Sequence, residues 1–205
     1  MKRFLTLLGL LLCCIPALSG ERGVLRWGLD WGYGLDVYKY WDINYIDNSS
    51  PYISPRVYDQ DSDFCARPYA YVTASMGFEP FSWMGVSVFS GISGASEERS
   101  VIPLGVRASF FPRGNTSHGP LLLAGGGVAF GLGSGFNGTC FGLLGGGWRF
   151  SLNPDWNLDF YLRLRVLKDA PPIWDEQNRN YVEENLIRKN LTIRASLGLG
   201  MAISF

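Results

Sequence analysis

Apolar residues alternate with small or polar ones over long stretches of this chain. Between Leu191 and Phe205 every odd position is apolar and every even position is small or polar. A period of two places successive side chains on opposite faces of a strand. Ordinary strands have about 5–6 residues, whereas a tilted strand that crosses a bilayer needs ~9–11 residues with apolar side chains toward lipid. The pattern therefore predicts a membrane-crossing strand that ends on an aromatic residue.

Seven other segments alternate in the same way, which gives eight predicted strands. The connections after the first and seventh strands, residues 38–65 and 168–190, are long and polar and are expected to be loops. The connections after the second and sixth strands have only four or five residues. Long outer loops and short periplasmic turns indicate an all-β, eight-stranded antiparallel up-and-down transmembrane β-barrel. The strands are expected at residues 25–37, 70–78, 84–92, 102–110, 121–132, 139–152, 158–166 and 191–205.

Charged residues within the predicted strands lie on the parity opposite the apolar face. A barrel of eight strands encloses only enough space for side chains, so these charges are expected to form an internal network of ion pairs. Arg194 is expected to pair with Asp30 or Asp36, because the last strand must lie beside the first to close the barrel. The alternative is a narrow pore. The predicted interior network comprises Asp30, Asp36, Arg107, Arg149, Asp159, Arg163, Arg165 and Arg194.

Aromatic residues gather near the predicted strand ends, which is typical of the two membrane interfaces. A soluble sandwich would place them nearer the strand centres. The ring at the short turns is expected to contain Trp27, Phe78, Trp83, Phe110, Phe111, Trp148, Phe150, Trp156 and Phe205. The opposite ring is expected to contain Tyr69, Tyr71, Phe89, Phe130, Phe136 and Phe141.

Composition agrees with a membrane barrel. Hydrophobic residues make up 47% of the 205 residues and the formal net charge is zero, so no nucleic-acid partner is indicated. Residues 1–19 are expected to be a secretory signal, with Lys2 and Arg3, an apolar core and the cleavage site Ala17-Leu18-Ser19. Residues 20–205 would form the barrel. A soluble lipocalin-like barrel would need a charged outer wall, and the available charge is too sparse for one.

The residues that could carry cofactors or metals are few. Cys65 and Cys140 lie outside the predicted signal, and either a disulfide or two separate thiols fits an exported protein. His118 is the single histidine, so no metal site and no cofactor are expected. The runs Gly125–Gly127 and Gly145–Gly147 lie within predicted strands, where glycine indicates bends or close packing.

The two longest loops concentrate aromatic residues among polar groups. Because these loops follow the first strand and precede the last, they are expected to emerge side by side. Exposed aromatics of this kind suit a glycan, a protein ligand or lipopolysaccharide sugars. The alternative is that they pack the loops onto the barrel rim. The predicted loop surface comprises Tyr40, Trp41, Tyr45, Tyr52, Tyr58, Trp174 and Tyr181.

Two segments carry a family resemblance. Ile102–Phe111, with the sequence IPLGVRASFF, and Gly119–Gly127, with GPLLLAGGG, resemble a pattern of Bacteroidota outer membrane protein beta-barrel families. The signal, the eight strands and the terminal Phe205 are similar to the membrane domain of outer-membrane protein A. The resemblance implies a bacterial outer-membrane location among outer-membrane lipids and lipopolysaccharide. It also implies insertion by the barrel assembly machinery, which reads a terminal strand with a final aromatic residue.

The resemblance to small barrels also raises one enzymatic alternative. Lipid A deacylases and palmitoyltransferases are similar in size and use a histidine with a serine and an acidic partner. Here His118 follows Ser117 in a predicted periplasmic turn, where a solvated histidine is expected. The sequence therefore favours a structural or surface-binding barrel without catalysis over a lipid A-modifying hydrolase or acyltransferase.

Overall fold

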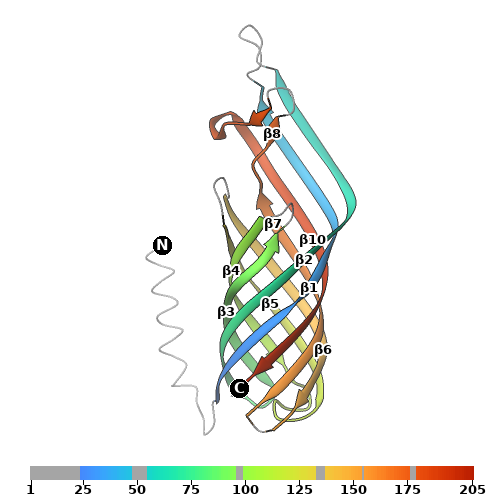
Figure 1. The fold of residues 1–205 in the computed structure, drawn as a ribbon, viewed down its shortest axis with the longest axis vertical. Helices are drawn as coiled ribbons and strands as arrows, with labels where there is room; N and C mark the ends of the chain where they lie inside the picture. The colour runs from blue at the N-terminus through green and yellow to red at the C-terminus, as the bar shows by residue number, and fades with distance from the viewer. Residues whose placement is uncertain (1–23, 48–54, 96–98, 133–136, 154, 176–178) are drawn as a thin grey trace.

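Eight antiparallel strands close into one barrel in the computed structural model, which describes residues 24–47, 55–95, 99–132, 137–153, 155–175 and 179–205 (Figure 1). The order around the ring is β1-β10-β7-β6-β5-β4-β3-β2, so neighbours in sequence are neighbours in space. The predicted eight-stranded up-and-down barrel is confirmed. The predicted signal, residues 1–19, lies outside the described residues. The ring comprises β1 (Val24–Ile46), β2 (Arg56–Phe81), β3 (Met84–Ala95), β4 (Arg99–Phe110), β5 (Gly119–Gly131), β6 (Asn137–Ser151), β7 (Asn157–Ala170) and β10 (Ile187–Ser204).

The last strand closes the ring against the first, as the alternation predicted. Gly28 is paired with Ser204, and Trp27 and Phe205 exchange backbone hydrogen bonds of 2.8 and 2.9 Å. Two shorter strands, β8 (Trp174–Asp175) and β9 (Asn180–Tyr181), form a hairpin, and a 3-10 turn covers Glu184–Leu186. Among the described residues, no helix is long and apolar enough to span a membrane.

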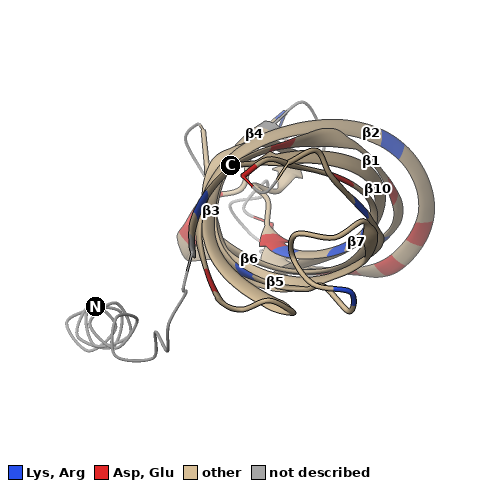
Figure 2. Ribbon diagram, turned by 90° about the horizontal axis from the view of Figure 1, so that it is seen from below, with Lys and Arg blue, Asp and Glu red and all other residues tan. Residues whose placement is uncertain are grey.

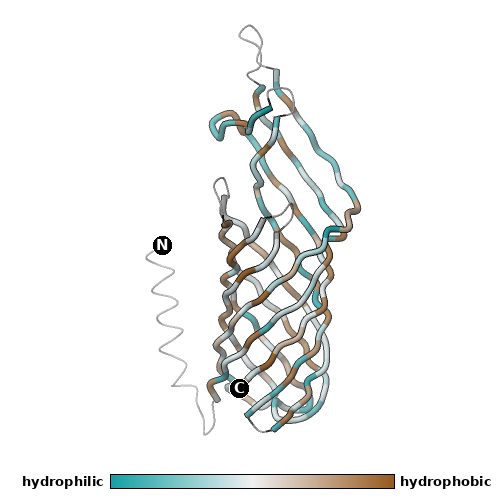
Figure 3. Tube along the Cα trace, viewed as in Figure 1, coloured by the Kyte–Doolittle hydropathy of each residue, from teal (hydrophilic) through white to brown (hydrophobic). Residues whose placement is uncertain are grey.

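The outer wall of the barrel is apolar and its interior is polar. Along β7 the exposed residues Leu162, Leu164 and Val166 alternate with the buried residues Arg163 and Arg165. The tube in Figure 3 is accordingly rich in hydrophobic positions along the barrel strands. An apolar surface this extensive is stable only against lipid. The closed ring therefore crosses a membrane.

Aromatic residues form one ring at the end with the short turns, which we call the turn end. Trp27, Trp83 and Trp148 are exposed there, and Trp156 stacks on Phe205 with ring centroids 4.9 Å apart. Phe111 is instead buried. The second predicted ring is wrong for Tyr69, Tyr71 and Phe89, which are buried inside the barrel because they lie on the interior parity. Phe130 is exposed, Phe141 packs against the core, and Phe136 lies outside the described residues.

The prediction that residues 38–65 form a loop is wrong for residues 38–46 and 56–65, which lie in β1 and β2, and residues 48–54 lie outside the described residues. β1 and β2 continue well past the barrel and stay paired from Tyr38↔Phe64 to Ile46↔Arg56. The prediction of a loop over residues 168–190 is wrong at both ends, since β7 reaches Ala170 and β10 begins at Ile187. These strand segments lie beyond the lipid, so the sequence need not alternate even though the backbone pairs. Beyond the barrel, residues 38–46 of β1 pair with residues 56–64 of β2 and with residues 187–195 of β10. We call this three-stranded extension the projecting sheet (Figure 1).

Candidate functional site

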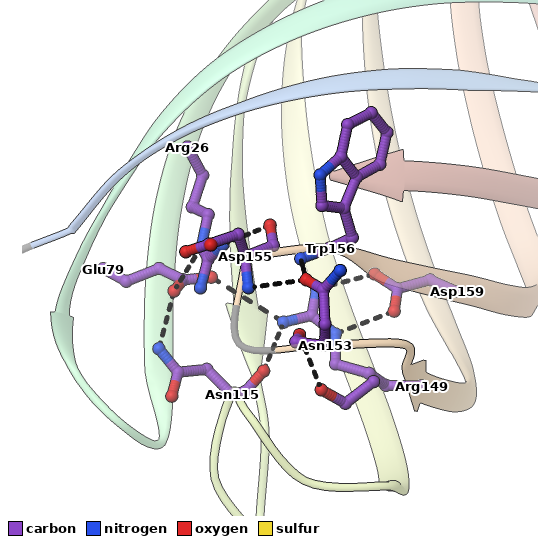
Figure 4. Close-up of polar contacts among 9 residues, drawn as sticks. Arg26, Glu79, Asn115, Arg149, Asn153, Asp155, Trp156 and Asp159 are labelled. Carbon is purple, nitrogen blue, oxygen red and sulfur yellow. Dashed lines mark hydrogen bonds and ion pairs between the residues drawn. The ribbon is translucent and has the colours of Figure 1, made fainter. Parts of the chain in front are cut away.

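A polar floor closes the barrel at the turn end (Figure 4). Arg149 on β6 lies opposite Asp159 on β7, and its guanidinium donates to both carboxylate oxygens at 2.7 Å. The same guanidinium lies 3.7 Å from Glu79 and donates to the carbonyl of Asn115 at 3.3 Å. The amide of Asn115 donates in turn to Glu79 at 2.6 Å. Side chains from two turn regions are therefore tied to the barrel wall.

Arg26 on β1 completes this floor. Its Nε lies 3.3 Å from Glu79, and its Nη1 donates to the carbonyl of Asp155 at 2.6 Å. Asn153 shapes that third turn, because its side-chain oxygen accepts from the backbone amides of Asp155 and Trp156 at 2.9 and 2.8 Å. We define the polar floor as Arg26, Glu79, Asn115, Arg149 and Asp159.

The middle of the interior is organised around Asp30. Arg107 donates to its carboxylate at 2.7 Å, and the hydroxyl of Tyr161 donates to the other oxygen. The hydroxyls of Tyr161 and Tyr71 are 3.2 Å apart. Arg163 stacks on the ring of Tyr71, with its guanidinium carbon 3.3 Å from the ring centroid. Cations are thus held by rings as well as by carboxylates.

Above this layer lies Asp36, which accepts from the hydroxyl of Ser196. Arg165 lies 3.5 Å from Asp36, donates to Ser93 at 3.0 Å and stacks on Tyr69 at 3.8 Å. Carboxylate, hydroxyl and aromatic ring thus all hold the Arg165 guanidinium at this level.

The expected pairing of Arg194 with Asp30 or Asp36 is wrong. Its Nη1 lies 3.7 Å from Asp169 on the neighbouring β7, higher in the barrel. Asp30 and Asp36 are instead engaged by Arg107 and Arg165.

The structure brings all eight predicted charged residues into the barrel. Two cavities between their layers measure about 60 and 30 Å³, which is room for a few water molecules. The strand pattern did not identify Arg26, Glu79, Asn115, Tyr71, Tyr161 and Asp169 as members. Asp169 could have been found by continuing the alternation of β7. Glu79 could not, because it was assigned to a turn.

The candidate hydrolase pair lies at the turn end. Ser117 and His118 are both exposed, and the imidazole packs edge-on against Phe150 with ring centroids 6.3 Å apart. Cys65 and Cys140 are free thiols in the structure.

A register shift in β1 changes which residues of the projecting sheet face inward. The β1–β10 register slips by one residue between Asp36 and Tyr38, so an extra residue of β1 bulges at this point. Below the bulge the even residues of β1 face the interior. Above it Lys39 and Trp41 lie opposite Arg194 and Thr192, whose side chains belong to the interior face. Without the bulge, Trp41 and Tyr45 would share the outward parity of the odd residues below it. With the bulge, they lie on the inner face of the projecting sheet.

A cavity of about 390 Å³ opens on this face, and we call it the loop-end cavity. One wall is the projecting sheet, and the other is the segment from Pro171 to Trp174. That segment is held in place because Asn190 donates to the carbonyl of Pro171 at 2.6 Å and Ile173 accepts from the backbone amide of Val182 at 2.9 Å. The cavity is lined by Lys39, Trp41, Ile43, Tyr45, Val57, Asp59, Pro171, Pro172, Ile173, Trp174 and Thr192.

The cavity collects some of the predicted loop aromatics and not others. Trp41, Tyr45 and Trp174 line it, and the indole N–H of Trp41 donates to Asp59 at 2.9 Å. Tyr181 contacts Trp174 edge-on at 5.1 Å. Two others lie on the opposite face of the sheet, where Tyr40 and Tyr58 both bond to Gln60. Tyr52 lies outside the described residues.

The environment of Tyr45 leads to a prediction on alkaline titration. Burial, and then the carboxylates of Asp175, Asp47 and Asp59, raise its pKa above the ordinary 10.0. The folded state therefore holds the phenolic proton more tightly than the unfolded state. Its contribution to stability is complete below pH 10 and is lost as the pH rises through the folded pKa.

We expect the phenolate absorbance that is lost in Tyr45→Phe to titrate with a midpoint above pH 10, measured as the difference between the parent protein and the variant. Asp59→Asn should move that midpoint downward, because one repulsive charge is removed. A midpoint at or below pH 10 in the parent protein would contradict this description of the cavity wall.

Comparison with known proteins finds similarity of fold only. No family model and no curated protein matches the chain. Among solved structures, Neisserial surface protein A is 14% identical, with 90% of this chain and 100% of that chain covered and a TM-score of 0.46. The outer membrane protein OprG from Pseudomonas aeruginosa is 13% identical, with 92% and 98% covered and a TM-score of 0.44. The attachment invasion locus protein of Yersinia pestis, solved with the heparin analogue sucrose octasulfate, is 14% identical, with 88% and 99% covered and a TM-score of 0.38.

The apolar wall and closed ring decide the class independently of these likenesses. The chain is a membrane-spanning β-barrel protein. At identities of 13–14%, the likeness to the solved structures concerns the fold and transfers no functional residue.

Proposed function

We propose that this protein is a non-catalytic barrel of the bacterial outer membrane that binds a short saccharide outside the cell. The observation that carries the proposal is the loop-end cavity. Its volume of about 390 Å³ lies within the ~300–1,000 Å³ of small-molecule sites. It lies at the end with the longer connections, which in outer-membrane barrels faces the exterior.

The lining of the cavity fits a sugar. Trp41, Tyr45 and Trp174 supply rings on which the C–H face of a sugar can stack. Asp59 and Lys39 supply an acceptor and a cationic donor for the sugar hydroxyls. The combination of flat apolar rings with separated polar groups suits a molecule that has one apolar face and a hydroxylated edge.

The barrel below serves as a rigid mount in this proposal. Strand pairing continues from the barrel into the cavity wall, across the bulge after Asp36, up to Tyr45↔Ile187. A site held on strands loses less conformational entropy when ligand binds than one on a loose loop. The interior network of charges supports a plug in place of a pore, and Ser117 and His118 lie exposed in a turn at the other end of the barrel.

The proposal includes the partners that the sequence indicated. Membrane lipids and lipopolysaccharide would surround the apolar wall. The barrel assembly machinery would engage β10, whose following residue Phe205 pairs with Trp27 at the closing seam.

The test is saccharide binding by the purified full-length mature chain in detergent. We expect a hit on a saccharide array, and Trp174→Ala should weaken its binding about 30-fold, because removing a central aromatic contact costs ~2 kcal/mol. Isothermal titration with the strongest saccharide measures the change.

Tyr58→Ala is the matched control. Tyr58 is an exposed aromatic residue on the opposite face of the same sheet, 58% accessible, and its removal should leave saccharide binding unchanged. Equal losses in the two variants, or an array without hits, would reject the proposed function.

A further inference from the structure

β2 has one long edge that is not used by the barrel. It pairs with β1 along nearly its whole length, but its pairing with β3 begins only at Tyr71↔Ser93. Residues 56–70 therefore pair on one side only, within the part of the chain that the structure describes. Figure 1 shows this segment of β2 as the outer margin of the projecting sheet. Such an edge presents a row of backbone N–H and C=O groups to another strand.

We propose that this edge binds an extended segment of a partner protein by strand addition, and that the segment alternates basic with apolar residues. Proteins usually block an exposed edge with charged side chains, proline or a bulge. On β2 the bulge at Cys65 and Ala66, and Pro68, lie at the barrel end of the edge, and residues 56–64 contain no proline and no lysine. The charges along these residues are mainly carboxylates, which repel an acidic strand and attract a basic one. The edge is therefore open to a partner of the right chemistry.

The two faces of the edge strand define that chemistry. Asp59, Asp61 and Asp63 lie on the inner face, opposite Ile43, Trp41 and Lys39 of β1. Lys39 is the one cation directly opposite these three carboxylates on β1. Figure 2 shows acidic positions along β2. An added strand would place every second side chain beside this row of carboxylates, so basic residues fit there.

The outer face of the edge strand favours apolar side chains in the partner. Phe64 is 84% exposed and Tyr58 is 58% exposed, and both lie on the parity opposite the three carboxylates. An aromatic or aliphatic residue beside each of them would cover apolar surface. A strand with a period of two satisfies both faces at once.

The charges also select against a second copy of this chain. Antiparallel pairing of this edge with itself, centred on Asp61, would bring Asp59, Asp61 and Asp63 against the same residues of another copy. Like charges directly opposite one another destabilise a strand pair. The acidic row therefore discourages self-association and favours a cationic partner.

The probe is a synthetic peptide of about nine residues that alternates lysine and valine, with blocked ends, titrated onto the full-length mature chain in detergent. We expect it to bind, and we expect a peptide of the same composition with lysines in blocks to bind at least about tenfold more weakly, because the faces no longer match. N-methylation of alternate amides on one set of positions should abolish binding, whereas methylation of the other set should not. This dependence would show hydrogen bonding along one edge.

Variants separate the edge from the cavity. Asp61→Asn with Asp63→Asn should weaken peptide binding about fivefold, because two cross-strand charge pairs are lost. Neither residue lines the cavity, so saccharide binding should not change. The matched control, Glu183→Gln with Glu184→Gln, removes two exposed carboxylates elsewhere and should leave peptide binding unchanged.

Three results would overturn the inference. Equal binding of the alternating and blocked peptides would indicate general charge attraction. Binding that tolerates N-methylation at both sets of positions would exclude strand addition. Loss of peptide binding in Trp174→Ala but not in Asp61→Asn/Asp63→Asn would place the peptide in the cavity.

Discussion

Replacing Asp159 with alanine should lower the free energy of unfolding by about 3–5 kcal/mol, because the change leaves a buried arginine without its main counter-ion. Arg149 is 4% exposed and donates to both oxygens of Asp159. Its remaining contacts, at 3.7 Å to Glu79 and 3.3 Å to a carbonyl, are longer. Urea unfolding in lipid vesicles, followed by tryptophan fluorescence, measures the change.

Asp155→Ala is the control for this substitution. Asp155 is an exposed carboxylate in the neighbouring turn, and only its backbone atoms bond to Asn153 and Arg26. The control should therefore change stability by less than about 0.5 kcal/mol. A double variant, Arg149→Met with Asp159→Leu, should recover much of the loss, since it buries no unpaired charge. If Asp159→Ala unfolds at the same urea concentration as Asp155→Ala, the polar floor does not stabilise the barrel.

The strands that touch lipid were predictable because lipid imposes a strict rule. Every outward residue of such a strand must be apolar and every inward residue must fit the interior, so the sequence alternates. This rule identified the strand from Leu25 to Val37 and the parity of Asp30 and Asp36. The alternation ends at Val37, which is where the β1 register slips.

Beyond that bulge the same rule no longer applies, so the strands of the projecting sheet were mistaken for loops. Water can surround both faces, and the backbone pairs without any apolar periodicity. The loop-end cavity depends on the bulge and on the hairpin contact of Ile173, neither of which leaves a sequence pattern. Its aromatic residues were identified from composition, but the division between Trp41 on one face and Tyr40 on the other was not.

The ion-pair partners of the interior charges could not be predicted from the sequence either. Parity places Arg194 inside, but the partner depends on the height of each residue in the barrel. The observed register sets Thr192 opposite Asp169 and so brings Arg194 within 3.7 Å of that carboxylate. Strand stagger, which fixes these heights, is a property of the closed ring and not of any one strand.

A glycine on β6 lies where the backbone of β7 leaves no room for a side chain. Gly147 lies on the interior face of β6, opposite Leu121 and Tyr161. A Cβ added there would overlap the backbone carbonyl of Phe160 and lie 2.5 Å from the Cα of Tyr161. Backbone atoms of a paired strand cannot move aside without breaking the ring. Gly147→Ala should therefore destabilise the barrel by about 2–3 kcal/mol, the upper range for overpacking.

Gly142→Ala on the same strand is the matched control, because an added Cβ there meets nothing within 4 Å. Alanine loses less conformational entropy than glycine on folding, so this variant should be neutral or more stable by up to about 0.5–1 kcal/mol. Neither position has a positive φ, so backbone conformation does not cause the difference between the two variants. Urea unfolding in vesicles should order them as Gly142→Ala, parent protein, Gly147→Ala from most to least stable. An equal response of the two would mean that the glycine run serves chain flexibility and not the close approach of β6 to β7.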